Sequence, residues 1–223
     1  MLENVEEMGV SEDPEFSREQ LIMIGFDLFG AGAETSSTTL CWAVQYLTLY
    51  PAVQERCSQE VRGLAGSGSI TLDHITKLHF CQATIAEIQR CSRVAPTNIM
   101  HRLTRNTRLP TGHSLPRDCI VQTNITSFLS SPELWHKPDL FQPERFLDSS
   151  GAFFRPEHFV PLGHGRRQCL GEPLARAELG IFFCSLVQRL QFSPAATPPD
   201  PTQYTAGLTR APLPFMVRCR IRN

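Results

Sequence analysis

The sequence predicts a mainly α-helical fold with a minor β sheet, and two observations support this prediction. Apolar residues recur at helical spacing in long segments between residues 18 and 93 and between 173 and 192. β-branched residues broken by turn signals occupy residues 102–127, and the last residues alternate between apolar and arginine side chains. With 223 residues, 41% of them hydrophobic, the chain has enough apolar surface to bury a core.

The first predicted helix is also the longest. Ser17 and Gln20 match a capping box, and nothing forbids helix from Arg18 to Tyr50, a rod of roughly 50 Å. Its middle, residues 30–39, is rich in glycine, serine and threonine, whose hydroxyls can bond back to the helix backbone. We therefore expect a kink or a widened turn there.

Four further helices and a C-terminal strand are expected in order. Pro51 fits the first turn of a second helix, which glycines at 63, 66 and 68 end. A short helix is expected after Thr71, and a helix with an apolar stripe from His79 to Arg93. Residues 130–168 contain five prolines and are predicted as loop, before a final helix from Pro173 to about Phe192. At the C-terminus, Phe215, Val217, Cys219 and Ile221 indicate a half-exposed strand.

Charge and cysteine content exclude several classes of protein. The net charge of −1 gives no overall attraction to nucleic acid. Eight cysteines without regular spacing predict reduced, mostly buried thiols rather than a disulfide framework. No apolar run is long enough to span a bilayer, and glutamates at 3, 6 and 7 do not suit a signal peptide, so we expect no anchor in this chain.

The segment from Pro161 to Leu179 contains the strongest candidate site. Cys169 lies just before a predicted helix, whose free backbone amides stabilise a thiolate. Gly163 and Gly165 allow a sharp turn and close approach of a flat ligand, and Arg167 can pair with carboxylates on it. A buried, unreactive cysteine is the ordinary alternative. Zinc is a poor rival because only one histidine lies nearby.

Two more motifs have ordinary alternatives when taken singly. Glu87 and Arg90 stand at i, i+3, a spacing typical of exposed ion pairs of small energy. Residues 31–36, Ala-Gly-Ala-Glu-Thr-Ser, can be a polar helix face, or can place Thr35 and Glu34 to bond a ligand and relay protons through water.

In this order, the motifs resemble those of the cytochrome P-450 family of haem-thiolate monooxygenases, most closely its microsomal family-two group. The haem loop matches at Gly165, Arg167, Cys169 and Gly171, although Leu162 replaces the usual phenylalanine. The resemblance covers the C-terminal half of the family's length, so it implies the C-terminal part of that fold. Residues 1–223 are accordingly expected to form a single-domain fragment.

The resemblance also implies residue roles. Cys169 would be the axial ligand of haem b, iron protoporphyrin IX, while Glu34 and Thr35 would serve proton delivery. Further cofactor contacts would be Arg167, His101, Gly165, Gly171 and Ala31. His101 remains open to an ordinary surface role, because Met100 stands where the family has proline.

Two other groups follow from the resemblance. Pro143–Phe146, "PERF", supplies Arg145 to a buried structural triad with Glu87 and Arg90. The residues expected to line a substrate pocket are Phe29, Ala31, Ala95, Ile99 and Thr209.

By resemblance, the chain is expected to insert one oxygen atom of O₂ into a small apolar substrate. Electrons would come from NADPH through cytochrome P-450 reductase, with cytochrome b5 as a further candidate partner, at the cytosolic face of the endoplasmic reticulum membrane. The alternative is a truncated, non-catalytic isoform that binds haem poorly or only competes for partners. A thiolate-haem isomerase is disfavoured because Glu34 and Thr35 are both present. The missing half leaves the substrate open among steroids, fatty acids, vitamins and drug-like molecules.

Overall fold

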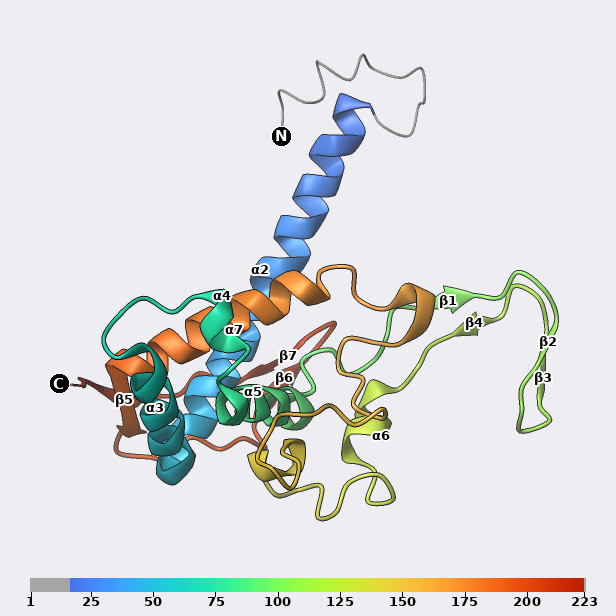
Figure 1. The fold of residues 1–223 in the computed structure, drawn as a ribbon. Helices are drawn as coiled ribbons and strands as arrows, with labels where there is room; N and C mark the ends of the chain where they lie inside the picture. Colours follow the sequence, from blue (N-terminus) through green and yellow to red (C-terminus); the bar gives the residue numbers. More distant parts are fainter. Residues whose placement is uncertain (1–16, 223) are drawn as a thin grey trace.

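The computed structural model describes residues 17–222, and its most prominent element is the helix α2, Arg18–Leu49. The Ser17 hydroxyl accepts a hydrogen bond from the backbone N–H of Gln20 at 3.2 Å and caps the helix, as predicted. Only the C-terminal part of α2, from Thr38 onward, is buried. The N-terminal part extends away from the rest of the molecule (Figure 1).

The expected kink or widened turn in α2 is wrong. The helix runs without interruption from Arg18 to Leu49, and it contains no π turn. The hydroxyls in this stretch do bond back to the helix, because Thr35 Oγ1 donates to the Ala31 carbonyl at 2.8 Å and Thr39 Oγ1 to the Thr35 carbonyl at 2.8 Å. These bonds add to the backbone ladder and leave it intact.

The other predicted helices are confirmed. Helix α3, Pro51–Ala65, has Pro51 in its first turn and ends at Gly66, whose φ is 58°. The short α4, Leu72–Ile75, is capped by Thr71. Helices α5 and α7 span His79–Ser92 and Glu172–Arg189.

Within residues 17–222, four separate two-stranded antiparallel ladders make up the minor β structure, and two 3₁₀ turns, η2 and η3, lie in loops. Strand β1 pairs with β4, β2 with β3, β5 with β8, and β6 with β7. The β2–β3 hairpin extends from one end of the molecule (Figure 1). The bounds are β1 His101–Arg102, β2 Thr107–Arg108, β3 Ser114–Leu115, β4 Ile120–Val121, β5 Leu190–Pro194, β6 Tyr204–Ala206, β7 Arg210–Pro212, β8 Val217–Ile221, η2 Pro143–Phe146 and η3 Gly165–Arg167.

Two details of these segments differ from expectation. A helix, α6, Ile125–Ser130, forms where the sequence favoured strand and loop, with the Asn124 side chain capping it. Strand β8 does not bury alternate residues, because Cys219 is exposed and Ile221 is 81% exposed. In the part of the chain that the structure describes, no second layer covers this end of the ladder.

Two clusters of buried apolar side chains hold these elements together. The larger one joins α2, α3, α5 and α7 around Trp42, Leu47, Leu78 and Phe183. The smaller one joins α5 and α6 to the loop that follows, around Trp135, Phe146 and Phe159. Helix α5 contributes to both, and most of its residues are buried.

All eight cysteines are free thiols, as predicted, although only four of them are buried. Among residues 17–222, no helix combines the length and apolar character that crossing a membrane requires.

Candidate haem-binding site

Cys169 lies in a tight loop that leads into α7. Gly163 and Gly165 have left-handed φ angles of 82° and 78°, which L side chains rarely adopt. The backbone N–H of Cys169 donates to the Leu162 carbonyl at 2.9 Å, and that of Gln168 donates to the Gly165 carbonyl at 3.1 Å. These bonds fold the loop back on itself and fix the backbone from which the thiol extends.

The loop also packs against the segment that follows α5. A Cβ added at Gly163 would lie 3.5 Å from the Gln168 Cα and 3.7 Å from the Asn98 amide nitrogen. Both are ordinary contacts, so the backbone conformation, and not lack of space, requires glycine at position 163. At Gly171, an added Cβ would lie 3.9 Å from the Cys169 sulfur and would narrow the approach to it.

The Cys169 thiol is exposed, and no hydrogen bond reaches it from any residue between 17 and 222. It precedes the first turn of an 18-residue helix, where free backbone amides favour a negative charge. Its neighbours Leu170 and Leu174 are apolar, and 84% and 58% of their surfaces are exposed. A thiol beside exposed apolar side chains at a helix N-terminus is suited to bind a flat, largely apolar ligand with an electropositive centre.

Glu34, Thr35 and Ser36 connect α2 to two distant parts of the chain. The Thr209 hydroxyl donates to Glu34 Oε1 at 2.6 Å, and the Ser36 hydroxyl donates to Glu178 Oε2 in α7 at 3.2 Å. Thr35 itself is half-buried, and its hydroxyl proton is held by the Ala31 carbonyl. Thr35 can therefore accept a hydrogen bond without breaking a contact, but it must release Ala31 before it can donate one.

The Ser36–Glu178 contact locates this part of α2 relative to the cysteine loop. Glu178 lies six residues beyond Glu172, the first residue of α7, which is about 9 Å along the helix axis. The thiol loop is thus about two turns beyond the point where α7 meets α2. Figure 1 shows α7 crossing α2 at this level, with the exposed part of α2 continuing past the crossing.

Glu87, Arg90 and Arg145 form a buried ionic cluster. Glu87 Oε2 accepts from Arg90 Nε at 2.6 Å, and Glu87 Oε1 accepts from Arg90 Nη2 at 2.9 Å and from Arg145 Nε at 3.1 Å. The Glu87 and Arg90 side chains are 0% and 1% exposed, and that of Arg145 is 9% exposed. The exposed-pair interpretation of Glu87 and Arg90 is therefore wrong.

The cluster binds backbone as well as side chains. Arg90 donates to the carbonyls of Leu129 and Leu140, Arg145 donates to those of His136, Lys137 and Leu140, and Glu87 accepts from the backbone N–H of Gln142 at 2.8 Å. Burial is the largest single influence and disfavours the Arg90 cation, but the hydrogen bonds with Glu87 and the negative charges of Cys91, Glu87 and Tyr46 together outweigh it and raise the pKa of Arg90. The cluster thereby ties α5 to the irregular segment between α6 and η2.

The Cys91 thiol lies beside this buried ionic cluster, which affects its pKa. Arg90 Nη2 lies 3.0 Å from the Cys91 sulfur. Burial, followed by the negative charge of Glu87, raises the pKa of Cys91 to about 12. Cys91 is therefore protonated near neutral pH, unlike a thiolate ligand.

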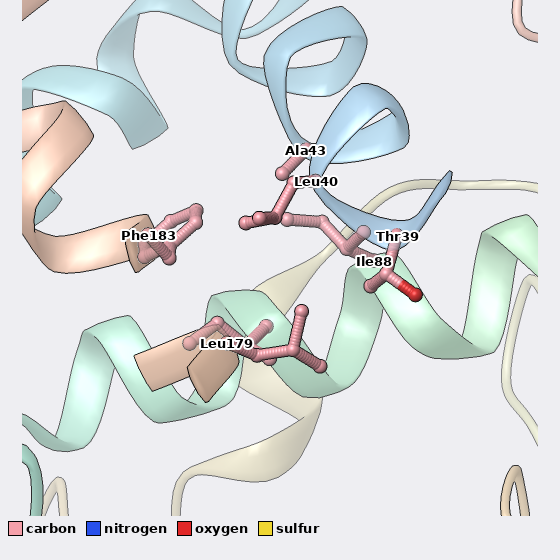
Figure 2. A pocket seen from close by; sticks show the side chains of 7 residues that line it. Thr39, Leu40, Ala43, Ile88, Leu179 and Phe183 are labelled. Carbon is pink, nitrogen blue, oxygen red and sulfur yellow. The ribbon is translucent and has the colours of Figure 1, made fainter. Parts of the chain in front are cut away.

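The remaining predicted residues are not gathered in one pocket. Phe29 and Ile99 are 79% and 72% exposed, Ala31 is exposed, and Ala95 is half-buried. None of them lines the cavity between α2, α5 and α7, which has a volume of only about 10 Å³. Figure 2 shows that the side chains of Leu40, Ala43, Ile88, Leu179 and Phe183 converge there, leaving room for one water at most.

The two predicted cationic contacts lie at the surface. Arg167 is exposed at the end of η3, and no ion pair joins it to another described residue. His101 is half-buried in β1, opposite Val121. Both side chains are available to an anionic group.

The described residues fit a haem group. Haem held through cysteine needs one thiolate on an open face, apolar surroundings for the ring and hydrogen-bond donors for its propionates. Cys169, the exposed leucines beside it, and Arg167 and His101 supply these features. No group of three or more His, Cys, Asp or Glu side chains within residues 17–222 could hold a metal ion directly.

Several contacts in this region had no signal in the sequence. The bonds Thr209–Glu34 and Ser36–Glu178 join residues 175 and 142 positions apart, and nothing in their local patterns links them. The backbone carbonyls that accept from Arg90 and Arg145, and the Gln142 N–H that donates to Glu87, were likewise not predicted from the sequence. Only the hydroxyl-rich composition of residues 35–39 indicated that this stretch of α2 makes unusual side-chain bonds.

Comparison with known proteins agrees with the geometry. The cytochrome P450 family model matches residues 2–219. Cytochrome P450 2D28 of Mesocricetus auratus is 37% identical over 218 residues, which is 97% of this chain and 43% of that protein. Cytochrome P450 2D9 of Mus musculus is 37% identical over 224 residues, covering all of this chain and 44% of the relative.

A member of a second subfamily matches equally well. Cytochrome P450 2J2 of Homo sapiens is 39% identical over 199 residues, covering 89% of this chain and 39% of that protein. The chain thus spans about two fifths of the length of the relatives it matches.

Proposed function

Because the chain belongs to the cytochrome P450 family, with microsomal-type relatives, we propose that it acts as a haem-thiolate monooxygenase or as part of one. The proposed reaction inserts one atom of O₂ into a small apolar organic substrate. Electrons come from NADPH through a flavoprotein reductase, with cytochrome b5 as a second candidate donor. The observation that carries the proposal is the exposed, unpartnered Cys169 thiol at the N-terminus of α7.

Cys169 holds the haem iron through its sulfur in this proposal. The amides of the first turn of α7 favour the thiolate form that binding requires. Gly165 and Gly171 keep side chains away from the face of the ring, and Arg167 and His101 pair with its propionates. Ala31 is small enough to let α2 approach the opposite face.

When bound, haem supplies the activation of dioxygen and the transfer of one oxygen atom to the substrate. Glu34 manages protons nearby: the Thr209 hydroxyl occupies its Oε1, while no bond from a described residue occupies its Oε2, which can take a proton from water. Thr35 accepts a hydrogen bond at its hydroxyl oxygen and orients that water. The buried Glu87–Arg90–Arg145 cluster has a structural role, because it holds α5 and not the cysteine loop.

The substrate side of the site is proposed from exposed side chains. Phe29, Ala31, Ala95 and Ile99 present apolar surface, and Thr209 adds a hydroxyl beside Glu34. Such a surface suits an apolar molecule with few polar groups. The cytosolic face of the endoplasmic reticulum is proposed as the location, from the microsomal type of the family.

The experiment that tests this function compares two exposed cysteines. Cys169→Ala is expected to abolish the thiolate spectrum of the reduced carbon monoxide complex, because the variant lacks the ligand. Cys219→Ala, which removes an equally exposed thiol from β8, is expected to leave that spectrum unchanged. A Cys169→Ala protein that keeps an intact thiolate spectrum would refute the assignment.

A second function is favoured by one observation. The N-terminal part of α2 exposes large apolar side chains, with Phe26 and Phe29 74% and 79% exposed. The side of the proposed site that α2 borders is therefore open to water. A non-catalytic chain that binds haem poorly, or competes for partners, fits this openness. The two functions are separated by haem content and NADPH-dependent oxidation of the purified 223-residue protein with reductase. Stoichiometric haem with coupled turnover eliminates the non-catalytic alternative.

A further inference from the structure

Arg210 is a buried arginine held in a fixed position at the start of β7. It is 9% exposed, and its guanidinium carbon lies 3.6 Å from the centre of the Tyr204 ring and 5.6 Å from that of Trp42. Its backbone is also fixed: the N–H donates to the Val94 carbonyl at 2.8 Å, and the carbonyl accepts from the Trp42 indole at 2.9 Å. Such a side chain has little freedom to turn toward solvent.

The Arg210 guanidinium has no acceptor among the described residues. Its Nε is fully buried and makes no hydrogen bond, and no carboxylate between residues 17 and 222 forms an ion pair with it. A second cation, Arg93, acts electrostatically on Arg210, and its Nε donates to the Cys91 carbonyl at 3.2 Å. No ion pair joins Arg93 to a carboxylate in this part of the chain either.

Both arginines line one pocket of about 240 Å³. Its other walls are mostly apolar or aromatic, formed by Pro96, Tyr204, Ala206 and Thr126. The Thr126 hydroxyl donates to the Pro96 carbonyl at 3.1 Å, so its proton is already engaged. The positive charge of the pocket therefore comes from the two guanidiniums, whose N–H groups can only donate.

An unpaired, half-desolvated pair of cations is unfavourable, and an anion would relieve it. Burial, followed by the charge of Arg93, lowers the pKa of Arg210. A carboxylate between the two guanidiniums would accept several charge-assisted hydrogen bonds and cancel their repulsion. The volume and apolar walls suit an organic acid with a small ring or chain better than a bare, strongly hydrated inorganic anion.

We propose that Arg93 and Arg210 form a binding site for the carboxylate of a small organic acid. The rest of the ligand would lie against Pro96, Tyr204 and Ala206. This site is separate from the proposed haem chemistry, and it requires neither Cys169 nor the metal. It adjoins that region only through Thr209, the residue before Arg210, which bonds Glu34.

The test uses benzoate as the probe and benzamide, a neutral molecule of the same shape, as the control ligand. Binding is measured by calorimetric titration and by thermal unfolding of the 223-residue protein. We expect saturating benzoate to raise the melting temperature by about 2–4 °C and benzamide to leave it unchanged. Inorganic phosphate at the same concentration is expected to give a smaller shift than benzoate.

Three variants locate the binding. Arg210→Met and Arg93→Gln are each expected to weaken benzoate binding by about tenfold or more, since each removes charge-assisted hydrogen bonds. Arg210→Met removes a cation without an ion-pair partner together with its contacts to two aromatic rings, and it keeps an unbranched side chain in their place, so it is expected to fold, which its own thermal unfolding curve checks. Arg218→Met, at an exposed arginine of β8, is the matched control and is expected to bind benzoate as the parent does.

The outcomes decide the proposal in either direction. Benzoate binding that falls with both pocket variants and persists with the control supports it. Equal effects of benzoate and benzamide, equal effects of phosphate and benzoate, or unchanged binding in Arg210→Met overturns it. None of these readings depends on haem content, so a failure here leaves the monooxygenase proposal to its own test.

Discussion

The substitution Glu87→Gln probes the buried ionic cluster through one functional group. Glutamine preserves the shape of the side chain but replaces one carboxylate oxygen with an amide donor. Glu87 accepts four hydrogen bonds, at 2.6 to 3.1 Å, from Arg90, Arg145 and the backbone of Gln142. The amide group would face at least one of these donors, and the guanidinium of Arg90 would lose its counter-charge.

The expected loss follows from burial. The Glu87 and Arg90 side chains are 0% and 1% exposed, so water cannot replace the missing interaction. Breaking such a pair by removing one partner costs about 3–5 kcal/mol, a large part of the 5–15 kcal/mol that stabilises a typical domain. The matched control is Glu144→Gln, because Glu144 pairs with Arg56 at 2.8 Å with side chains 47% and 52% exposed. Loss of that pair is expected to cost about 1 kcal/mol or less.

Urea denaturation followed by circular dichroism measures both free energies of unfolding. A midpoint for Glu87→Gln well below that of Glu144→Gln, at equal slope, is the expected result. If the two variants lose the same free energy within error, burial does not determine the strength of these pairs. The structural role assigned to the cluster would then be wrong.

Two further predictions concern thiols and glycines. Dithionitrobenzoate at pH 8 is expected to modify three thiols rapidly in the native protein, because only three are exposed, and all eight after denaturation. Cys119 is half-buried, four further thiols are buried, and burial also raises the pKa of Cys81 and Cys91 and keeps both protonated; a fourth or fifth rapid thiol would contradict this. The rapid thiols are Cys41, Cys169 and Cys219. Gly180→Ala is expected to lower the free energy of unfolding by about 1–3 kcal/mol, since the added Cβ would lie 2.8 Å from the Ile75 side chain. Gly63→Ala, which has open space around it, is expected to raise the free energy of unfolding by about 0.5–1 kcal/mol. Equal urea midpoints for the two variants would disprove the packing argument.

Elements with strong local patterns were predictable from the sequence. Helix α5 was expected at His79–Arg93 and is found at His79–Ser92, because one apolar stripe and a left-handed cap at Arg93 define it. Pro51 and Gly66 likewise delimit α3. In these segments, propensity, periodicity and caps all favour the same structure.

Tertiary contacts decided the remaining elements. Helix α6 has β-branched residues, and it forms because Ile125 and Leu129 pack into the smaller apolar cluster. In β8, apolar and arginine residues alternate in the sequence and the strand forms as predicted. Its apolar face is nevertheless exposed, because such a face is buried only where another layer covers it. The hydroxyls of Thr35 and Thr39 do bond the carbonyls one turn earlier, but in α2 these bonds are made without opening the helix.

For the candidate site, the sequence predicted the members of the buried ionic cluster, which the structure brings together, and Cys169 as a ligand, which stays a prediction; it did not predict the long-range contacts around them. Cys169 and the Glu87–Arg90–Arg145 triad follow from motifs in the chain. Long-range contacts depend on how distant segments of the chain meet. Examples are the hydrogen bonds of Glu34 and Ser36 and the position of Arg93 and Arg210 in one pocket. Local patterns carry no information about such contacts.

The uneven burial of α2 has a mechanical consequence. Its last turns are buried in the larger apolar cluster. The preceding part, about 27 Å of helix from Arg18 to Ser36, has no buried residue and contacts the rest of the described chain only near its C-terminal end. Glu34 and Ser36 lie where this exposed part of α2 meets the rest of the fold, and they accept from Thr209 and donate to Glu178, respectively. A protein surface that binds the N-terminal part of α2 would therefore move Glu34, the carboxylate proposed to handle protons, without contacting it.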